Sequence, residues 1–113
     1  MLNVSRSLRE IRDQSEILQE LTHSLNNTNV LGIFLKNEEE MITTSVTAID
    51  YNDTGVTIHL KDQDLHGYPI ERTKVPLFEI AGVIPFNTRF DDPVYVQIRK
   101  RKKADKSIAA TLN

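Results

Sequence analysis

Residues 30–85 decide the fold of this chain, and they run from Ile33-Phe34-Leu35-Lys36-Asn37 near their start to Ile80-Ala81-Gly82-Val83-Ile84-Pro85 at their end. Short apolar or alternating segments follow one another here, and turn residues separate them. Val56-Thr57-Ile58-His59-Leu60 has the clearest pattern, because its apolar and polar side chains alternate as in a strand with one buried face. This part of the chain predicts a β-sheet with no helix between its strands.

The other predicted strands have weaker versions of the same pattern. Residues 30–35 form a continuous apolar run, which is typical of a buried strand or of one at the centre of a bent sheet. Pro76 cannot donate to a strand ladder and is expected at an edge or a strand end. We predict strands over residues 30–35, 41–49, 56–60, 70–75 and 80–84.

Residues 3–25 are expected to form one helix ahead of the sheet. Apolar side chains from Val4 to Leu25 are spaced by three and four, Ser7 and Glu10 fit a capping box, and Asn26-Asn27 favour a stop. After the sheet, residues 86–93 read as irregular, and residues 94–98 alternate like a further strand. The expected core consists of Leu8, Ile11, Leu18, Leu21, Phe34, Val46, Ile58, Leu60, Ile80 and Val83.

The composition limits the class of protein. A length of 113 residues is usual for one domain, and the absence of cysteine excludes a disulfide scaffold, a thiolate metal site and a cysteine nucleophile. Charged side chains occur throughout the first twenty residues, so neither a signal peptide nor a membrane span begins there. We expect a cytoplasmic protein with one domain over residues 1–98 and a basic, disordered tail over residues 99–113.

The charge is distributed unevenly along the chain. Residues 1–93 hold eight Lys or Arg against fifteen Asp or Glu, a net charge of −7, whereas residues 94–113 hold six against one, a net charge of +5. An acidic body repels phosphate and a basic segment attracts it. The tail is therefore a candidate contact for nucleic acid or for an acidic partner, or else a solubilising terminus.

No motif in the sequence points firmly to an enzyme. Asp53-Thr54-Gly55 matches the tripeptide of aspartic proteases, but a hairpin turn requires the same residue types. His23, His59 and His66 lack the spacing of metal ligands, and there is no glycine-rich phosphate loop. We expect no catalytic activity, no cofactor and no metal, with a dimeric aspartic hydrolase as the remaining enzymatic alternative.

The run from Val30 to Asn37, Asp50 after the second strand, residues 56–60 and residues 75–85 together resemble the Sm-like superfamily, most closely its bacterial Hfq-like members. The likeness covers residues 3–86. It implies an N-terminal helix followed by a small, strongly bent five-stranded antiparallel sheet, that is, an Sm-like or SH3-like barrel. It also implies a homo-oligomeric ring, formed by pairing outer strands of neighbouring subunits, with uridine- or adenine-rich RNA around the pore.

The candidate RNA contacts fall into two groups. The first is the basic run, and the second consists of residues that the resemblance places at the pore. Glu79 opposes RNA binding at the pore, because its negative charge lies where the resemblance places phosphate. The alternative is a protein-interaction or structural module with the same barrel and no nucleic-acid binding. The candidates are Arg99, Lys100, Arg101, Lys102 and Lys103 in the basic run, and Tyr51, Asn52 and Arg72 at the pore.

Overall fold

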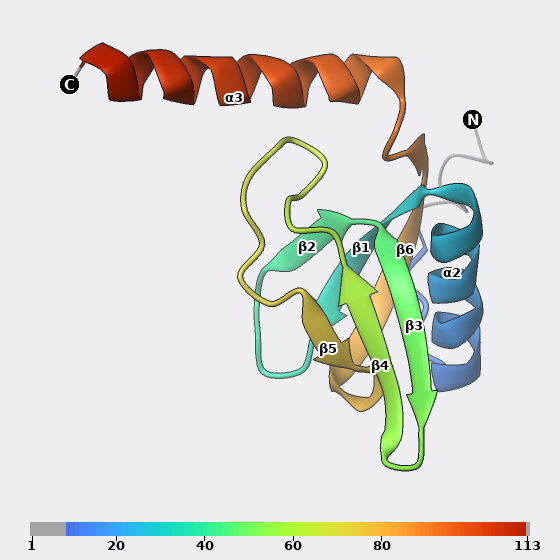
Figure 1. The fold of residues 1–113 in the computed structure, drawn as a ribbon. Coiled ribbons are helices and arrows are strands. Elements are labelled where there is room, and N and C mark those ends of the chain that lie inside the picture. Colours follow the sequence, from blue (N-terminus) through green and yellow to red (C-terminus); the bar gives the residue numbers. More distant parts are fainter. Residues whose placement is uncertain (1–8, 113) are drawn as a thin grey trace.

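The structure is a computed structural model that describes residues 9–112, with side chains described for residues 9–103. Two helices flank a small β-structure in Figure 1. In chain order the elements are α2 (Gln14–Asn27), β1 (Asn29–Leu35), β2 (Met41–Thr44), β3 (Val46–Asn52), β4 (Gly55–Leu60), β5 (Lys74–Pro76), the 3-10 helix η1 (Leu77–Glu79), β6 (Ile80–Arg89) and α3 (Pro93–Leu112).

The strands of the described chain form two three-stranded antiparallel sheets, in the orders β2-β1-β6 and β3-β4-β5. Only Ser45 separates β2 from β3, so the chain passes from one sheet to the other over a single residue. A helix followed by small antiparallel sheets is therefore confirmed. Neither sheet is closed, and the expected strand over residues 41–49 is broken at Ser45 into two.

One face of α2 packs against both sheets and closes the core. Ile17 and Leu21 contact a buried cluster that includes Ile33, Ile58 and Val83, each of which has no exposed surface. Burial of each such side chain stabilises the fold by about 1.5–3 kcal/mol. Expected core residues that are buried are Leu21, Val46, Ile58, Leu60, Ile80 and Val83, while Ile11 and Leu18 are half-buried against the same cluster.

Phe34 was wrongly predicted to lie in this core. Side chains alternate between the two faces of a strand, and in β1 the residues Leu31, Ile33 and Leu35 are buried. Phe34 therefore lies on the opposite face and is only half-buried. Leu8 lies outside the described residues.

Ser24 connects the helix to both sheets. Its side chain is fully buried, and its hydroxyl donates to the carbonyl oxygen of Asn29 at 2.6 Å and accepts from the backbone N–H of Val46 at 2.9 Å. One side chain thereby satisfies a backbone group at the start of β1 and another at the start of β3. This bond pair fixes α2 relative to the bend at Ser45.

Helix α2 begins at Gln14, later than the sequence pattern predicts. Asp13 caps it by accepting from the N–H of Glu16, at 3.1 Å. Glu10 is not helical, so the predicted capping box is wrong, and its other member, Ser7, lies outside the described residues. The segment before Asp13 is extended because Ile11 and Val83 exchange two backbone hydrogen bonds, at 2.7 and 2.9 Å.

The end of the chain differs most from expectation. Strand β6 continues to Arg89, so residues 86–89 are not irregular, and the strand expected over 94–98 is wrong because α3 begins at Pro93. Asp92 accepts from the N–H of Val94 at 2.9 Å, which caps the helix, and proline suits the first helical turn. The helix runs to Leu112 instead of the expected disordered tail from Arg99.

Candidate nucleic-acid interface

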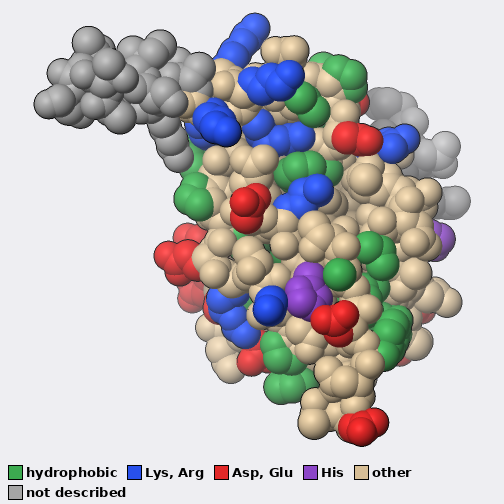
Figure 2. Space-filling view, viewed as in Figure 1, with side chains coloured by type: hydrophobic (Ala, Val, Ile, Leu, Met, Phe, Trp, Pro, Cys, Tyr) green, Lys and Arg blue, Asp and Glu red, His purple; other side chains and the backbone are tan. Residues whose placement is uncertain are grey.

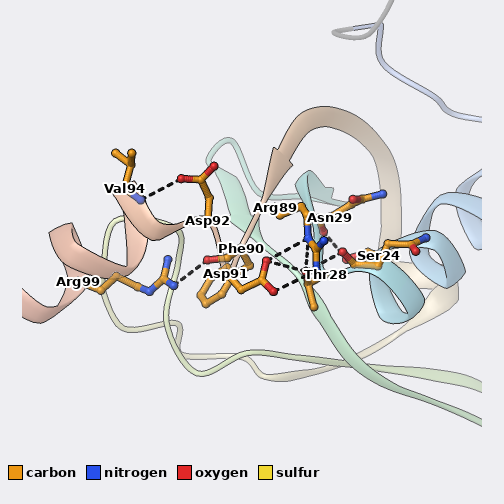
Figure 3. Close-up of polar contacts among 10 residues, drawn as sticks. Ser24, Thr28, Asn29, Arg89, Phe90, Asp91, Asp92, Val94 and Arg99 are labelled. Carbon is orange, nitrogen blue, oxygen red and sulfur yellow. Dashed lines mark hydrogen bonds and ion pairs between the residues drawn. The ribbon is translucent and has the colours of Figure 1, made fainter.

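The start of α3 is fixed to the body by a polar junction, drawn in Figure 3. Thr28 follows α2 and accepts from the N–H of Phe90 through its carbonyl oxygen, at 2.7 Å. Its hydroxyl donates to Asp91 at 3.1 Å and accepts from Arg89 at 3.2 Å, and Arg89 also pairs with Asp91. The junction ties the end of α2 to the turn between β6 and α3.

The pKa of Asp91 lies below its usual value. Partial desolvation is the largest single effect and raises it, but the hydrogen bond from the Thr28 hydroxyl, the charge and hydrogen bond of Arg89 and a backbone hydrogen bond together outweigh that effect. Asp91 is therefore charged at neutral pH, and the junction depends on that charge.

Arg99 holds the next turn of α3 against the body. Its guanidinium donates to the carbonyl oxygen of Leu65 at 3.0 Å and to that of Phe90 at 2.7 Å, and it lies 3.9 Å from the centroid of the Phe90 ring. Burial lowers the pKa of Arg99, and the nearby Asp91 carboxylate partly offsets this effect. An arginine remains charged despite such a shift. All of its close contacts point inward, so it is not a phosphate contact in this geometry.

Lys102 faces the body in the same way. Its ammonium lies 3.2 Å from the centroid of the Tyr68 ring, which belongs to the β4–β5 loop (residues 61–73). Lys61, at the start of that loop, lies 4.9 Å from the Phe90 ring. Phe90 also joins Val30 and Leu65 in a small second apolar cluster beneath the helix. Cation–π contacts and this cluster dock α3 onto the loop.

The remaining cations of the basic run are more exposed than Arg99 and Lys102. Lys100, Arg101 and Lys103 are exposed on α3. Figure 2 shows Lys and Arg side chains gathered over the described part of α3 and next to it, while the rest of the visible face mixes acidic, basic, histidine and hydrophobic side chains. The sequence identified the run of cations, but it did not separate those that contact the body from those that are exposed.

A groove of about 470 Å³ lies between α3 and the β4–β5 loop. We call it the basic groove. Gly67 lies in the loop wall, and a Cβ there would approach Arg99 and Lys102 at 3.4–3.6 Å. Its φ of +94° also favours glycine. The lining residues are Asp62, Gln63, Gly67, Val96, Arg99, Lys100, Lys102 and Lys103.

The pore-side candidates do not join this surface. Tyr51 is 66% exposed and lies beside α2, in a groove that it shares with Leu18. Asn52 belongs to the β3–β4 turn, where its side chain accepts from the N–H of Thr54 at 3.0 Å. That turn and α3 lie at opposite ends of the molecule in Figure 1. Arg72 pairs with Glu79 at 2.5 Å, so the two charges offset each other.

The remaining motifs have local structural roles. Asp53-Thr54-Gly55 forms the turn between β3 and β4, as the turn interpretation predicts. His59 contacts Asp50 across the β3–β4 pair at 2.6 Å. Within the described residues, no three His, Cys, Asp or Glu side chains gather as metal ligands would, and no helix is long and apolar enough to cross a membrane.

Comparison of this chain with protein-family models, curated proteins and solved structures finds no match.

Proposed function

We propose that this chain is a non-catalytic, Sm-like binding protein that contacts RNA phosphates through α3. The observation that carries the proposal is that the five cations of the basic run fall into two groups, those that contact the body and those that are exposed. Arg99 and Lys102 dock the helix through inward contacts, while Lys100, Arg101 and Lys103 are exposed on it. A docked helix presents its charges in a fixed arrangement, so less conformational entropy is lost when phosphate binds.

The charge of the rest of the chain supports the same assignment. Residues 1–93 carry a net charge of −7, so their field repels phosphate and directs it towards α3. The Arg72–Glu79 pair leaves little positive charge at the expected pore side. Contact through α3 is therefore favoured over contact through Tyr51, Asn52 and Arg72.

Binding at several salt concentrations tests the proposal. Three phosphate contacts on a single strand imply a slope of log affinity against log salt of about −2, from about −0.7 per contact. Replacing Lys100, Arg101 and Lys103 together with Gln should make the slope less steep by about that amount. The matched control replaces three exposed cations on other elements, Arg12, Lys36 and Lys74, and should leave it unchanged. A steep slope in the first variant would show that RNA binds elsewhere.

The proposal includes self-association of the Sm-like kind, through the outer strands β5 and β6. Both are edge strands of their sheets, and exposed edges favour pairing. Val83 on the β6 edge already bonds to Ile11, and Pro85 offers no N–H, so pairing along β6 requires residues 9–12 to move aside. Ile11→Pro removes one of these bonds and should raise the oligomer fraction in light scattering. A mass of 12.9 kDa for both proteins at micromolar concentration would refute the ring.

A second candidate, a protein-interaction module, is favoured by one other groove. It has a volume of about 530 Å³ between β2 and the β4–β5 loop, with Met41, Ile42 and Ile70 among acidic residues that include Glu40 and Glu71. Such a groove suits a basic peptide with apolar side chains. Fluorescence polarisation with peptides of this kind tests it, because Met41→Glu should abolish their binding while leaving RNA binding intact.

A further inference from the structure

The fold brings exposed aromatic side chains next to the basic groove. The Tyr68 ring is 58% exposed, and the ammonium of Lys102 lies against it. Nearby, the exposed His66 ring stands edge-on to the half-buried Tyr95, with ring centroids 5.8 Å apart and ring planes at 79°. Exposed rings beside cations are the combination with which proteins bind unpaired bases, because every base has a face that can stack.

The turn that carries Tyr68 is ordered before any ligand binds. The side chain of Asp64 accepts from the N–H of His66 at 2.9 Å and from that of Tyr68 at 2.8 Å. The backbone N–H of Asp64 also donates to the carbonyl oxygen of Tyr68, at 2.8 Å. A base that stacks on this ring therefore does not have to order the loop, which lowers the entropic cost of binding.

The two walls of the basic groove differ in chemistry. The α3 wall carries Lys100 and Lys103, which attract phosphate, whereas the loop wall carries Asp62 and Gln63. A carboxylate repels phosphate but can accept hydrogen bonds from base amino groups, and an amide can bond to base edges as donor or acceptor. Phosphates are therefore expected on the α3 wall and unpaired bases on the loop wall, an arrangement that a duplex with its bases paired cannot match.

Resting on the proposed function, we infer that the basic groove and the adjoining Tyr68 ring, which lines the neighbouring groove beside β2, bind a single-stranded segment of nucleic acid. One base stacks on Tyr68 in the place that Lys102 occupies in the free protein. The displaced Lys102 ammonium then pairs with a phosphate of the same segment. Lys102 thus covers the ring in the free state and adds a phosphate contact in the bound state.

Fluorescence polarisation with three probes tests this inference, namely a single-stranded RNA, an RNA duplex of the same sequence and inorganic polyphosphate, which has charge but no bases. Tyr68→Ala should weaken binding of the single strand by about 5- to 150-fold, the range that loss of one stacking contact gives. Tyr68→Phe keeps the ring and should bind like the unaltered protein. Polyphosphate should bind both variants equally. A single-stranded DNA should follow the RNA, because no proposed contact involves the 2′-hydroxyl.

Tyr51→Ala is the matched control, since Tyr51 is similarly exposed, at 66% against 58% for Tyr68, but lies in the groove beside α2. Three outcomes separate the possibilities. If Tyr68→Ala weakens the binding of RNA and of polyphosphate equally, stacking is refuted. Polyphosphate has no bases, so an equal loss would mean that the substitution acts only on the charges that bind phosphate. If Tyr68→Ala binds the single strand as well as the unaltered protein does, the inference is refuted, but the proposed RNA contact through α3 stands. Absence of salt-dependent binding to all probes by the unaltered protein refutes the proposed function itself.

Discussion

Replacing Arg99 with Ala should release α3 from the body without unfolding the sheets. The substitution removes two hydrogen bonds to carbonyl oxygens, at 2.7 and 3.0 Å, and a ring contact at 3.9 Å. Each hydrogen bond contributes about 1 kcal/mol net at such a site, and a partly exposed cation–π contact contributes about 0.5–1 kcal/mol. The docking of α3 should therefore weaken by about 2–3 kcal/mol, which corresponds to about 30- to 150-fold more frequent opening.

Amide hydrogen exchange measures this opening directly. Exchange in residues 96–103 should accelerate by that factor, whereas exchange in β1 and β4 should change little, because Arg99 does not contact the main core. Arg101→Ala is the matched control, since it makes the same change in helix propensity at an exposed position of the same helix. Equal acceleration in the two variants would show that Arg99 does not dock the helix. A uniform acceleration over all strands by Arg99→Ala would show that α3 is part of the global folding unit.

The remaining predictions concern the body and its pH dependence. Ile58→Ala should lower the free energy of unfolding in urea by about 2–5 kcal/mol, and Phe34→Ala by only about 1–2 kcal/mol, because Ile58 is fully buried and Phe34 is not; equal losses would contradict the assigned faces of β1. Ser24→Ala should cost about 1–3 kcal/mol, because it leaves the buried N–H of Val46 without its partner; a neutral effect in the same assay would mean that another group replaces the hydroxyl. The pKa of Asp91 is lowered in the folded state, so its contribution is present above the unfolded pKa of about 3.9 and is lost as the pH falls through the lower folded value. Asp91→Asn should therefore flatten the stability curve below about pH 4, and a curve parallel to that of the unaltered protein would contradict this.

The β-region was predictable because strand alternation is a local signal. Residues 56–60 lie within β4, and the turn at Asp53-Thr54-Gly55 joins β3 to β4. The expected strand over residues 80–84 ends before Pro85, whereas β6 continues through this proline to Arg89. The backbone N–H of Val83 points away from β1 and bonds to Ile11. Because backbone groups two residues apart in a strand point the same way, the nitrogen of Pro85 also points away from β1, and the absence of its N–H costs no hydrogen bond to β1.

The last helix was missed because five residues with alternating apolar side chains are an ambiguous pattern. The sequence does contain the stronger signal, an Asp before a Pro, which is a helix N-cap followed by a proline at the first position. In the structure Asp92 takes that capping role. The Asp92-Pro93 pair predicts a helix that begins at Pro93, and this signal is stronger than the five-residue alternation that follows it.

The candidate site was predictable only as a cluster of charge. Leu65 and Arg99 are 34 residues apart, as are Tyr68 and Lys102, and no local pattern indicates that these pairs meet. From the sequence alone, all five cations are therefore predicted to be equivalent phosphate contacts, and the β4–β5 loop is predicted to be only a polar connection. The separation into docking cations and exposed cations, and the position of Tyr68, depend on tertiary packing.

The choice of partners for the docking cations explains how an acidic body can carry a usable basic surface. A carboxylate partner would dock a cation equally well, but it would also cancel the charge. In the described part of the chain, Arg99 donates to two carbonyl oxygens and lies against the Phe90 ring, and Lys102 lies against the Tyr68 ring. Carbonyl and ring contacts hold a cation in place without neutralising it. Both docking cations therefore still contribute to the positive field around α3, and that field can attract phosphate even though the body carries a net charge of −7.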